Sequence, residues 1–158
     1  MPPGPMDTPN YKLPDYYVNR ELSWLEFNRR VLFEAANDDT PLLERLKFLC
    51  IVSTNLDEFF EIRVSGLQQR LEMGAAPAGP DMLTPLQVLN SIAEQTHELV
   101  DEQYRLLNDV LFPELAQAGV NFVRADSWTD EQRVWLDEYF REQVVPVLSP
   151  LTFDPSRP

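Results

Sequence analysis

Hydrophobic and polar positions follow helical spacing over most of residues 20–118 of this chain. A capping box that starts at Ser23 and is completed by Glu26 predicts a first helix over about 23–36. The next run, about 41–52, is apolar on most sides. A helix without a polar face is usually buried, so we expect this one to lie at the centre of the fold.

The stretch Ser53-Thr54-Asn55 interrupts the apolar run. Ser, Thr and Asn favour helix N-caps, so this stretch predicts a break or a new cap, with Asp57 and Glu58 in the first turn of the helix that follows. The break would leave Asn55 accessible. The third helix should then run to about Met73, on an apolar stripe formed by Leu56, Phe59, Phe60, Val64, Leu67 and Leu71.

A long helix is predicted from Thr84-Pro85 to about Ala118, after a loop rich in Gly, Pro and Ala. Alternating spacings of three and four define a seam that should pack on another helix: Leu89, Ile92, Thr96, Leu99, Gln103, Leu106 and Val110. Residues 84–118 contain six acidic residues and a single basic one, Arg105. We interpret the outer face as a solvated acidic surface, with a partner site as the alternative.

The pattern changes after Gly119. Residues 120–123 resemble a short strand, Thr129 and Gln132 form a capping box for a helix over about 130–143, and residues 144–153 allow an edge or irregular strand. We therefore expect a mainly α protein. It should consist of a Pro-rich tail (1–19), a helical bundle with a long helix (20–118), and the truncated beginning of an α/β domain (119–158), so that the chain is a fragment.

Composition limits the possible functions. The formal net charge is −13 and 44% of the residues are apolar, so the chain can form a core but should not bind nucleic acid or another polyanion by a broad basic surface. Cys50 is the only cysteine and lies in an apolar run, so we expect a buried thiol and a reducing compartment. No run approaches the roughly 18 apolar residues of a membrane span. These features predict a soluble, cytoplasmic protein.

The sequence shows no catalytic set. His97 is the only histidine and lies among acidic residues, so a surface position is expected, and we predict no metal site. Two polar residues, Asn28 and Arg63, fall on apolar stripes and need partners, because an unpaired buried polar group costs about 1–3 kcal/mol. For Arg63 the expected partner is a carboxylate of the first or second helix, and the alternative is a ligand.

Two segments carry a resemblance to a known family. "RELSWLEFNRRVLFEA" (20–35) and "PLLERLKFLCIVSTNLDEFFEIRVSGL" (41–67) strongly resemble the amino-terminal helical domain of polyphosphate kinases of the long, histidine-phosphorylating class. A weaker resemblance extends to "FREQVVPVLSPLTFDPSRP" (140–158), which is similar to the start of that family's head domain.

The resemblance implies a function. Members of the family transfer the terminal phosphate of ATP reversibly to inorganic polyphosphate, through a phosphohistidine and with Mg²⁺. The catalytic histidines, the magnesium ligands and the polyphosphate tunnel would lie in later domains, so this chain alone should be inactive. The full-length enzyme would be a homo-oligomer, cytoplasmic or peripherally associated with the membrane.

Within this domain the resemblance assigns Asn55 to the adenine of ATP, and Arg63 is the weaker candidate for a ligand contact. A side-chain amide offers one donor and one acceptor, which suits the N6/N7 edge of adenine. The alternative function is a structural or oligomerisation module whose long helix binds neighbouring domains.

Overall fold

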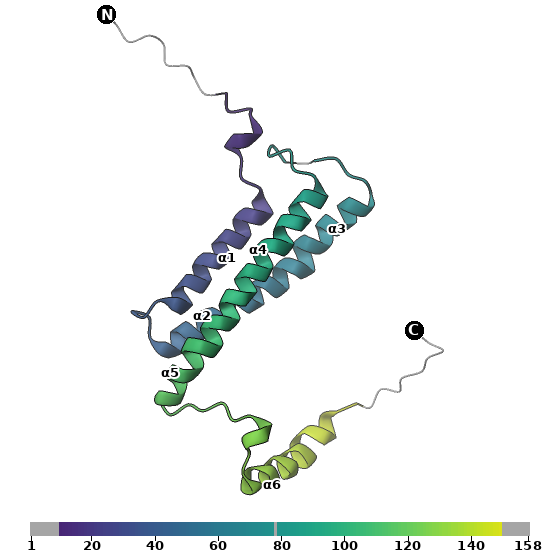
Figure 1. Cartoon of the computed structure of the whole chain (residues 1–158). Coiled ribbons are helices and arrows are strands. Elements are labelled where there is room, and N and C mark those ends of the chain that lie inside the picture. The colour runs from purple at the N-terminus through teal and green to yellow at the C-terminus, as the bar shows by residue number, and fades with distance from the viewer. Residues whose placement is uncertain (1–9, 78, 150–158) are drawn as a thin grey trace, which may run out of the picture. The chain divides into compact units, whose positions relative to one another are not determined.

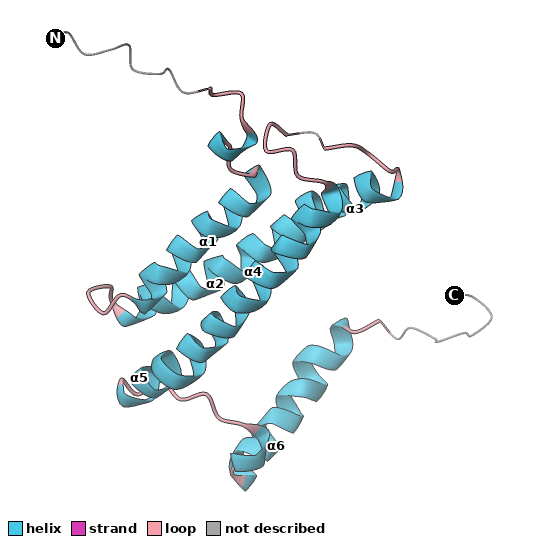
Figure 2. Cartoon of the chain, turned by 45° about the horizontal axis from the view of Figure 1, so that its top comes forward, coloured by secondary structure: helices cyan, strands magenta, loops and turns pink. Residues whose placement is uncertain are grey.

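The computed structural model describes residues 10–77 and 79–149. The chain divides into two compact units, with the boundary between Val120 and Asn121. Helices make up most of the described residues and no strand occurs among them, which confirms the mainly α fold class (Figures 1 and 2). None of the described helices is long and apolar enough to cross a membrane.

Helix α1 (Arg20–Ala36) begins earlier than predicted. Asn19, and not Ser23, is the N-cap, because the Asn19 side chain accepts hydrogen bonds from the backbone amides of Glu21 and Leu22, at 3.0 and 3.3 Å. The predicted cap at Ser23 is therefore wrong. Ser23 lies one turn inside the helix, where its own amide donates to the Asn19 carbonyl.

The predicted break at residues 53–55 is also wrong. Helix α2 (Leu42–Glu58) continues through it into the π-helical segment η2 (Phe59–Val64) and then α3 (Ser65–Glu72). The polar side chains are satisfied without a cap: the Thr54 hydroxyl donates to the Cys50 carbonyl one turn back, and the Ser53 hydroxyl accepts from Gln103. Asp57 and Glu58 thus end α2 and do not begin a new helix.

The long helix is confirmed. Thr84 caps it in a capping box with Gln87, and α4 (Pro85–Leu106), the π-helical segment η3 (Leu107–Leu111) and α5 (Phe112–Gln117) follow without interruption. The predicted seam faces inward at the buried residues Ile92, Thr96, Leu99, Gln103 and Leu106.

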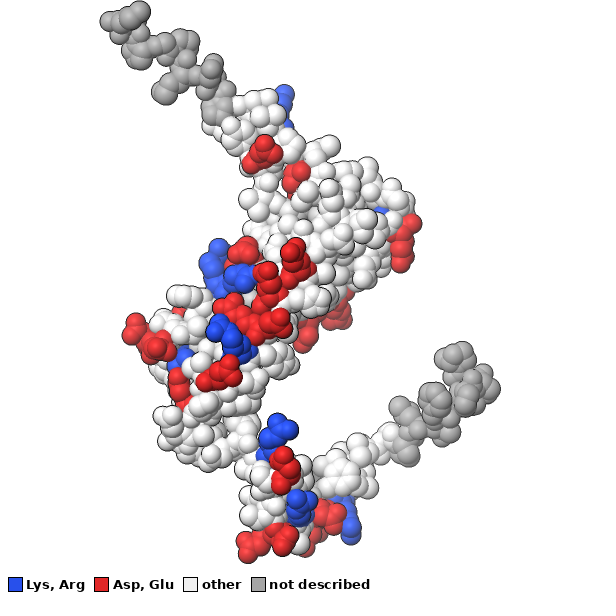
Figure 3. Space-filling view, viewed as in Figure 1, with Lys and Arg blue, Asp and Glu red and all other residues white. Residues whose placement is uncertain are grey.

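These helices form a bundle in which α1 contacts both α2 and α4, and α3 also contacts α4 (Figure 1). The shared core includes Leu25, Leu32, Val52, Phe59, Ile92 and Leu99. Arg29 of α1 forms ion pairs at 3.6 Å with Glu98 and with Glu102 of α4. Acidic side chains gather on this face with only a few basic ones among them (Figure 3).

The predicted burial of Cys50 is wrong, because Cys50 is exposed on the outer side of α2.

The second unit contains the short 3₁₀ turn η4 (Ala125–Ser127), α6 (Asp130–Tyr139), the π-helical segment η5 (Phe140–Val144) and the 3₁₀ turn η6 (Val145–Val147). The capping box of Thr129 with Gln132 is confirmed. The strand expected at residues 120–123 is absent, and residues 144–149 are a helical turn and coil; residues 150–153 lie outside the described part. The assignment of residues 119–158 to an α/β domain stays a prediction. A third 3₁₀ turn, η1 (Pro14–Tyr16), precedes α1.

Candidate functional site

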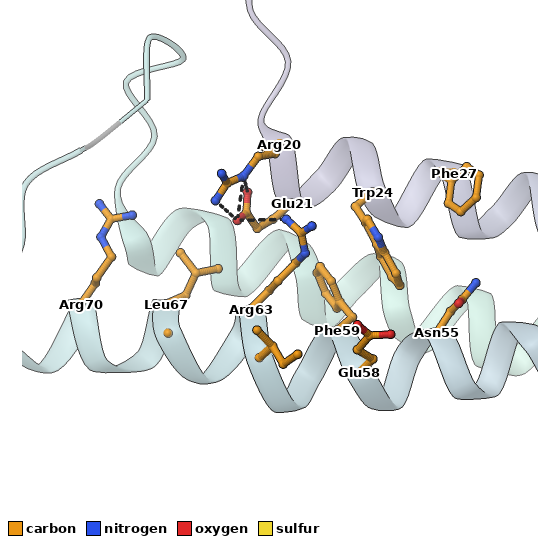
Figure 4. A pocket seen from close by; sticks show the side chains of 12 residues that line it. Arg20, Glu21, Trp24, Phe27, Asn55, Glu58, Phe59, Arg63, Leu67 and Arg70 are labelled. Atoms are coloured by element: carbon orange, nitrogen blue, oxygen red, sulfur yellow. Dashed lines mark hydrogen bonds and ion pairs between the residues drawn. The ribbon is translucent and has the colours of Figure 1, made fainter.

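A groove of about 550 Å³ runs between α1 and the continuous helix formed by α2, η2 and α3 (Figure 4). This volume is within the range of small-molecule sites. The side chains that α1 contributes are Arg20, Glu21, Trp24 and Phe27, and the longer helix contributes Asn55, Glu58, Phe59, Ile62, Arg63, Leu67 and Arg70. Asn55 and Phe27 lie toward one end of the groove, and Arg70 lies toward the other (Figure 4).

Aromatic rings form part of the groove wall. Trp24 stacks on Phe59, with ring centroids 4.6 Å apart and planes within 6° of parallel. Phe59 is 1% exposed, so the stack is anchored in the core. Phe27 is 48% exposed, although the Arg30 guanidinium lies over its ring, 5.9 Å from the ring centroid. The groove therefore has apolar surface available to a planar ligand.

Asn55 is held by a second amide. Its Nδ2 donates to Asn28 Oδ1 at 2.9 Å, and Asn28 Nδ2 donates to the Val52 carbonyl at 3.2 Å. Asn28 is fully buried, which confirms that it faces packed surface, and the two hydrogen bonds satisfy it. No hydrogen bond from residues 10–77 or 79–149 reaches Asn55 Oδ1, so this acceptor stays available in the groove.

Charged side chains also line the groove. Glu21 is only 8% exposed and pairs with Arg20 at 3.0 Å and with Arg63 at 4.0 Å. The hydrogen bond from Arg20 to Glu21 and the charge of Glu21 raise the pKa of Arg20 above its ordinary value. Arg70 also lines the groove and donates to the Ala76 carbonyl at 3.2 Å. Arginines outnumber carboxylates here, although the whole chain carries a net charge of −13.

The structure thus brings the two sequence-derived candidates, Asn55 and Arg63, into one groove. The expected carboxylate partner of Arg63 is Glu21, on the first helix. Sequence reasoning did not select Glu21, Trp24 or Phe27 as site residues. The predicted capping box at Ser23 explains this helix start by backbone capping alone, so it gives no reason to assign these side chains to a ligand. The adjacent charges of Arg20 and Glu21, four residues before the apolar Leu25, are the sequence signal that could have selected Glu21.

Other expectations concern His97 and the neighbouring carboxylates Asp57 and Glu58. His97 is exposed on α4, as predicted. Glu58 lines the groove, whereas Asp57 lines a separate hollow near Gln103 and Tyr104, so the two carboxylates do not act as a pair. Among the described residues no group of three or more His, Cys, Asp or Glu side chains could hold a metal ion.

Comparison with known proteins identifies the family. The family described as "Polyphosphate kinase N-terminal domain" matches residues 17–123, a range that contains every residue of the groove. The chain belongs to the polyphosphate kinase family.

Individual relatives support this assignment. The chain is 48% identical over 150 residues to the polyphosphate kinase of Pseudomonas syringae pv. tomato and 50% identical over 148 residues to that of Xylella fastidiosa. These alignments cover 95% and 94% of this chain but 20% and 21% of the relatives, so the chain spans about a fifth of their length.

A solved structure has the same fold. The crystal structure of polyphosphate kinase from Porphyromonas gingivalis matches with a TM-score of 0.73 and 31% sequence identity, over 89% of this chain and 20% of that one. This match covers more than the helical bundle of residues 20–118.

Proposed function

We propose that this chain is the nucleotide-contacting amino-terminal region of a polyphosphate kinase, in which Asn55 binds the adenine of ATP. The observation that carries the proposal is the groove itself. It combines a side-chain amide with a free acceptor, an exposed phenylalanine ring and arginines, in a part of the chain that matches the family domain. Such a surface suits a planar heterocycle that carries an anionic group.

The reaction proposed for the complete protein is the reversible transfer of the terminal phosphate of ATP to inorganic polyphosphate. The phosphorylated histidine, the ligands of Mg²⁺ and the polyphosphate-binding residues would belong to parts of the protein outside this chain. Residues 20–118 would supply the base-binding surface, with Asn55 as the specific contact and Arg63 as a weaker one. We place the complete enzyme in the cytoplasm as a homo-oligomer.

Substitution of Asn55 tests the nucleotide role. Loss of one neutral hydrogen bond costs about 0.5–1.5 kcal/mol, and tenfold corresponds to about 1.4 kcal/mol. Asn55→Ala in the full-length protein should therefore raise KM for ATP several-fold, up to roughly tenfold. The turnover number should change less, because phosphate transfer takes place away from the base. Asn90→Ala, at an exposed position of α4 outside the groove, is the matched control.

The alternative function is a structural or oligomerisation module. The extended acidic face of α4 favours it, because such a surface can bind neighbouring domains. In that case Asn55→Ala would lower the melting temperature and leave both the ATP dependence and the preference for ATP over GTP unaltered. That result would reject the adenine contact.

A further inference from the structure

Asn28 does not line the groove, but it is hydrogen bonded to Asn55, which does. It lies on α1 at 0% exposure, and both of its amide atoms are engaged. Its Nδ2 donates to the Val52 carbonyl, and its Oδ1 accepts from Asn55 Nδ2. Its position in the core explains its burial, but a core position could equally hold a leucine. Asn28 differs from a leucine because it donates one hydrogen bond and accepts another.

The direction of these bonds follows from the Val52 carbonyl, which can only accept. Asn28 must therefore turn its NH₂ group toward Val52, at 3.2 Å. Its Oδ1 then faces Asn55, which must donate through Nδ2, at 2.9 Å. A backbone acceptor in α2 thus fixes the orientation of two side-chain amides in turn.

The orientation of Asn55 decides what it can offer a ligand. With one Nδ2 hydrogen bonded to Asn28, the Oδ1 acceptor and the other Nδ2 hydrogen remain for the groove. If the Asn55 amide flipped, its oxygen would face Asn28 Oδ1. That arrangement loses a hydrogen bond and opposes two acceptors in a buried place.

We propose that Asn28 is a positioning residue that makes the groove select 6-aminopurine over 6-oxopurine nucleotides. Adenine carries a donor at position 6, whereas guanine carries an acceptor there. An Asn55 Oδ1 that Asn28 holds in place accepts a hydrogen bond from the 6-amino group of adenine and repels the 6-oxo group of guanine. Without Asn28, Asn55 can turn its NH₂ toward a 6-oxo group. The inference rests on the proposed function, because it concerns the same adenine contact.

The test compares ATP with inosine triphosphate, in which a carbonyl oxygen replaces the 6-amino group. The measured quantity is the ratio of kcat/KM for the two nucleotides in the full-length protein. Asn28→Leu keeps the volume but frees Asn55, and should lower this ratio about three- to tenfold. Asn28→Ser has a hydroxyl too short to reach Asn55 and should have the same effect, so it replaces the leucine variant if that variant does not fold.

A conservative variant and a matched control isolate the orienting role. Burial raises the pKa of a carboxyl group, so Asn28→Asp should stay neutral, donate to Val52 and accept from Asn55. Its nucleotide ratio should stay near that of the wild type. Gln103→Leu removes another buried amide that donates to a helix carbonyl, that of Leu49. It should lower stability and leave the ratio unchanged.

The outcomes separate the two hypotheses. If Asn55→Ala changes the ratio and the loss variants of Asn28 do not, the positioning role is wrong and the adenine contact stands. If neither changes it, the proposed function fails as well. If Gln103→Leu lowers the ratio as much as Asn28→Leu does, the effect comes from general destabilisation, and the positioning role is rejected.

Discussion

Arg45 should be one of the most sensitive positions in the bundle. It is 4% exposed at the start of α2 and joins three elements. Its Nε donates to the Ala35 carbonyl in the last turn of α1 at 2.9 Å, and its Nη1 pairs with Glu114 of α5 at 2.8 Å. A further ion pair, at 3.4 Å, links it to the exposed Asp38.

The perturbation is Arg45→Met, which keeps most of the aliphatic stem and removes the guanidinium. The Ala35 carbonyl would lose a side-chain partner in a buried place, which costs about 1–3 kcal/mol. Glu114 is partly exposed and can be rehydrated, so its pair contributes at most about 1 kcal/mol. We expect a total loss of about 1–4 kcal/mol. For a unit of this size the melting temperature should fall by roughly 4 °C or more.

Urea unfolding followed by circular dichroism at the helix minimum measures this loss. Arg105→Met is the matched control, because Arg105 is exposed on α4 and should change stability by no more than about 0.5 kcal/mol. The stability of Arg45→Lys should be intermediate, since one ammonium group cannot reproduce the two separate guanidinium N–H groups that bind the Ala35 carbonyl and Glu114. An Arg45→Met variant as stable as the Arg105 control would refute this account of the α1–α2 junction.

Two further predictions concern local features. Thr84→Ala removes the side chain that accepts from the Gln87 amide, so it should cost about 1 kcal/mol of unfolding free energy, whereas Thr84→Ser should cost little; chemical denaturation of the two variants checks this. Cys50 is exposed, so a thiol reagent should label it rapidly without denaturant; labelling only after unfolding would show that the thiol is buried.

The sequence predicted the helical bundle because its signals were local and repeated. The capping box at Thr84 and the three-and-four spacing of the seam both specify a helix without reference to the rest of the chain. At Ser23 and at residues 53–55 the same cap signals failed. Ser and Thr can also bond one turn back inside a helix, as Thr54 does, or receive a bond from another helix, as Ser53 does from Gln103. The choice depends on tertiary contacts that no local pattern contains.

Asn55 is accessible, as predicted, but not for the predicted reason. Asn55 was expected to be accessible because a helix broke there, but it lies within an unbroken helix and is accessible because α1 leaves a groove beside it. At 3.6 residues per turn, Asn55 and Arg63 would point about 80° apart. The π-helical segment between them, in which the Ser65 amide bonds back to the Phe60 carbonyl, fits more residues into each turn. It therefore reduces the rotation from one residue to the next. Residues eight apart already share one face of a regular helix, as Leu56 and Val64 do on the predicted stripe, so the π-helical segment only narrows the angle between Asn55 and Arg63. What the sequence could not show is that α1 lies beside this face and forms the other wall of the groove.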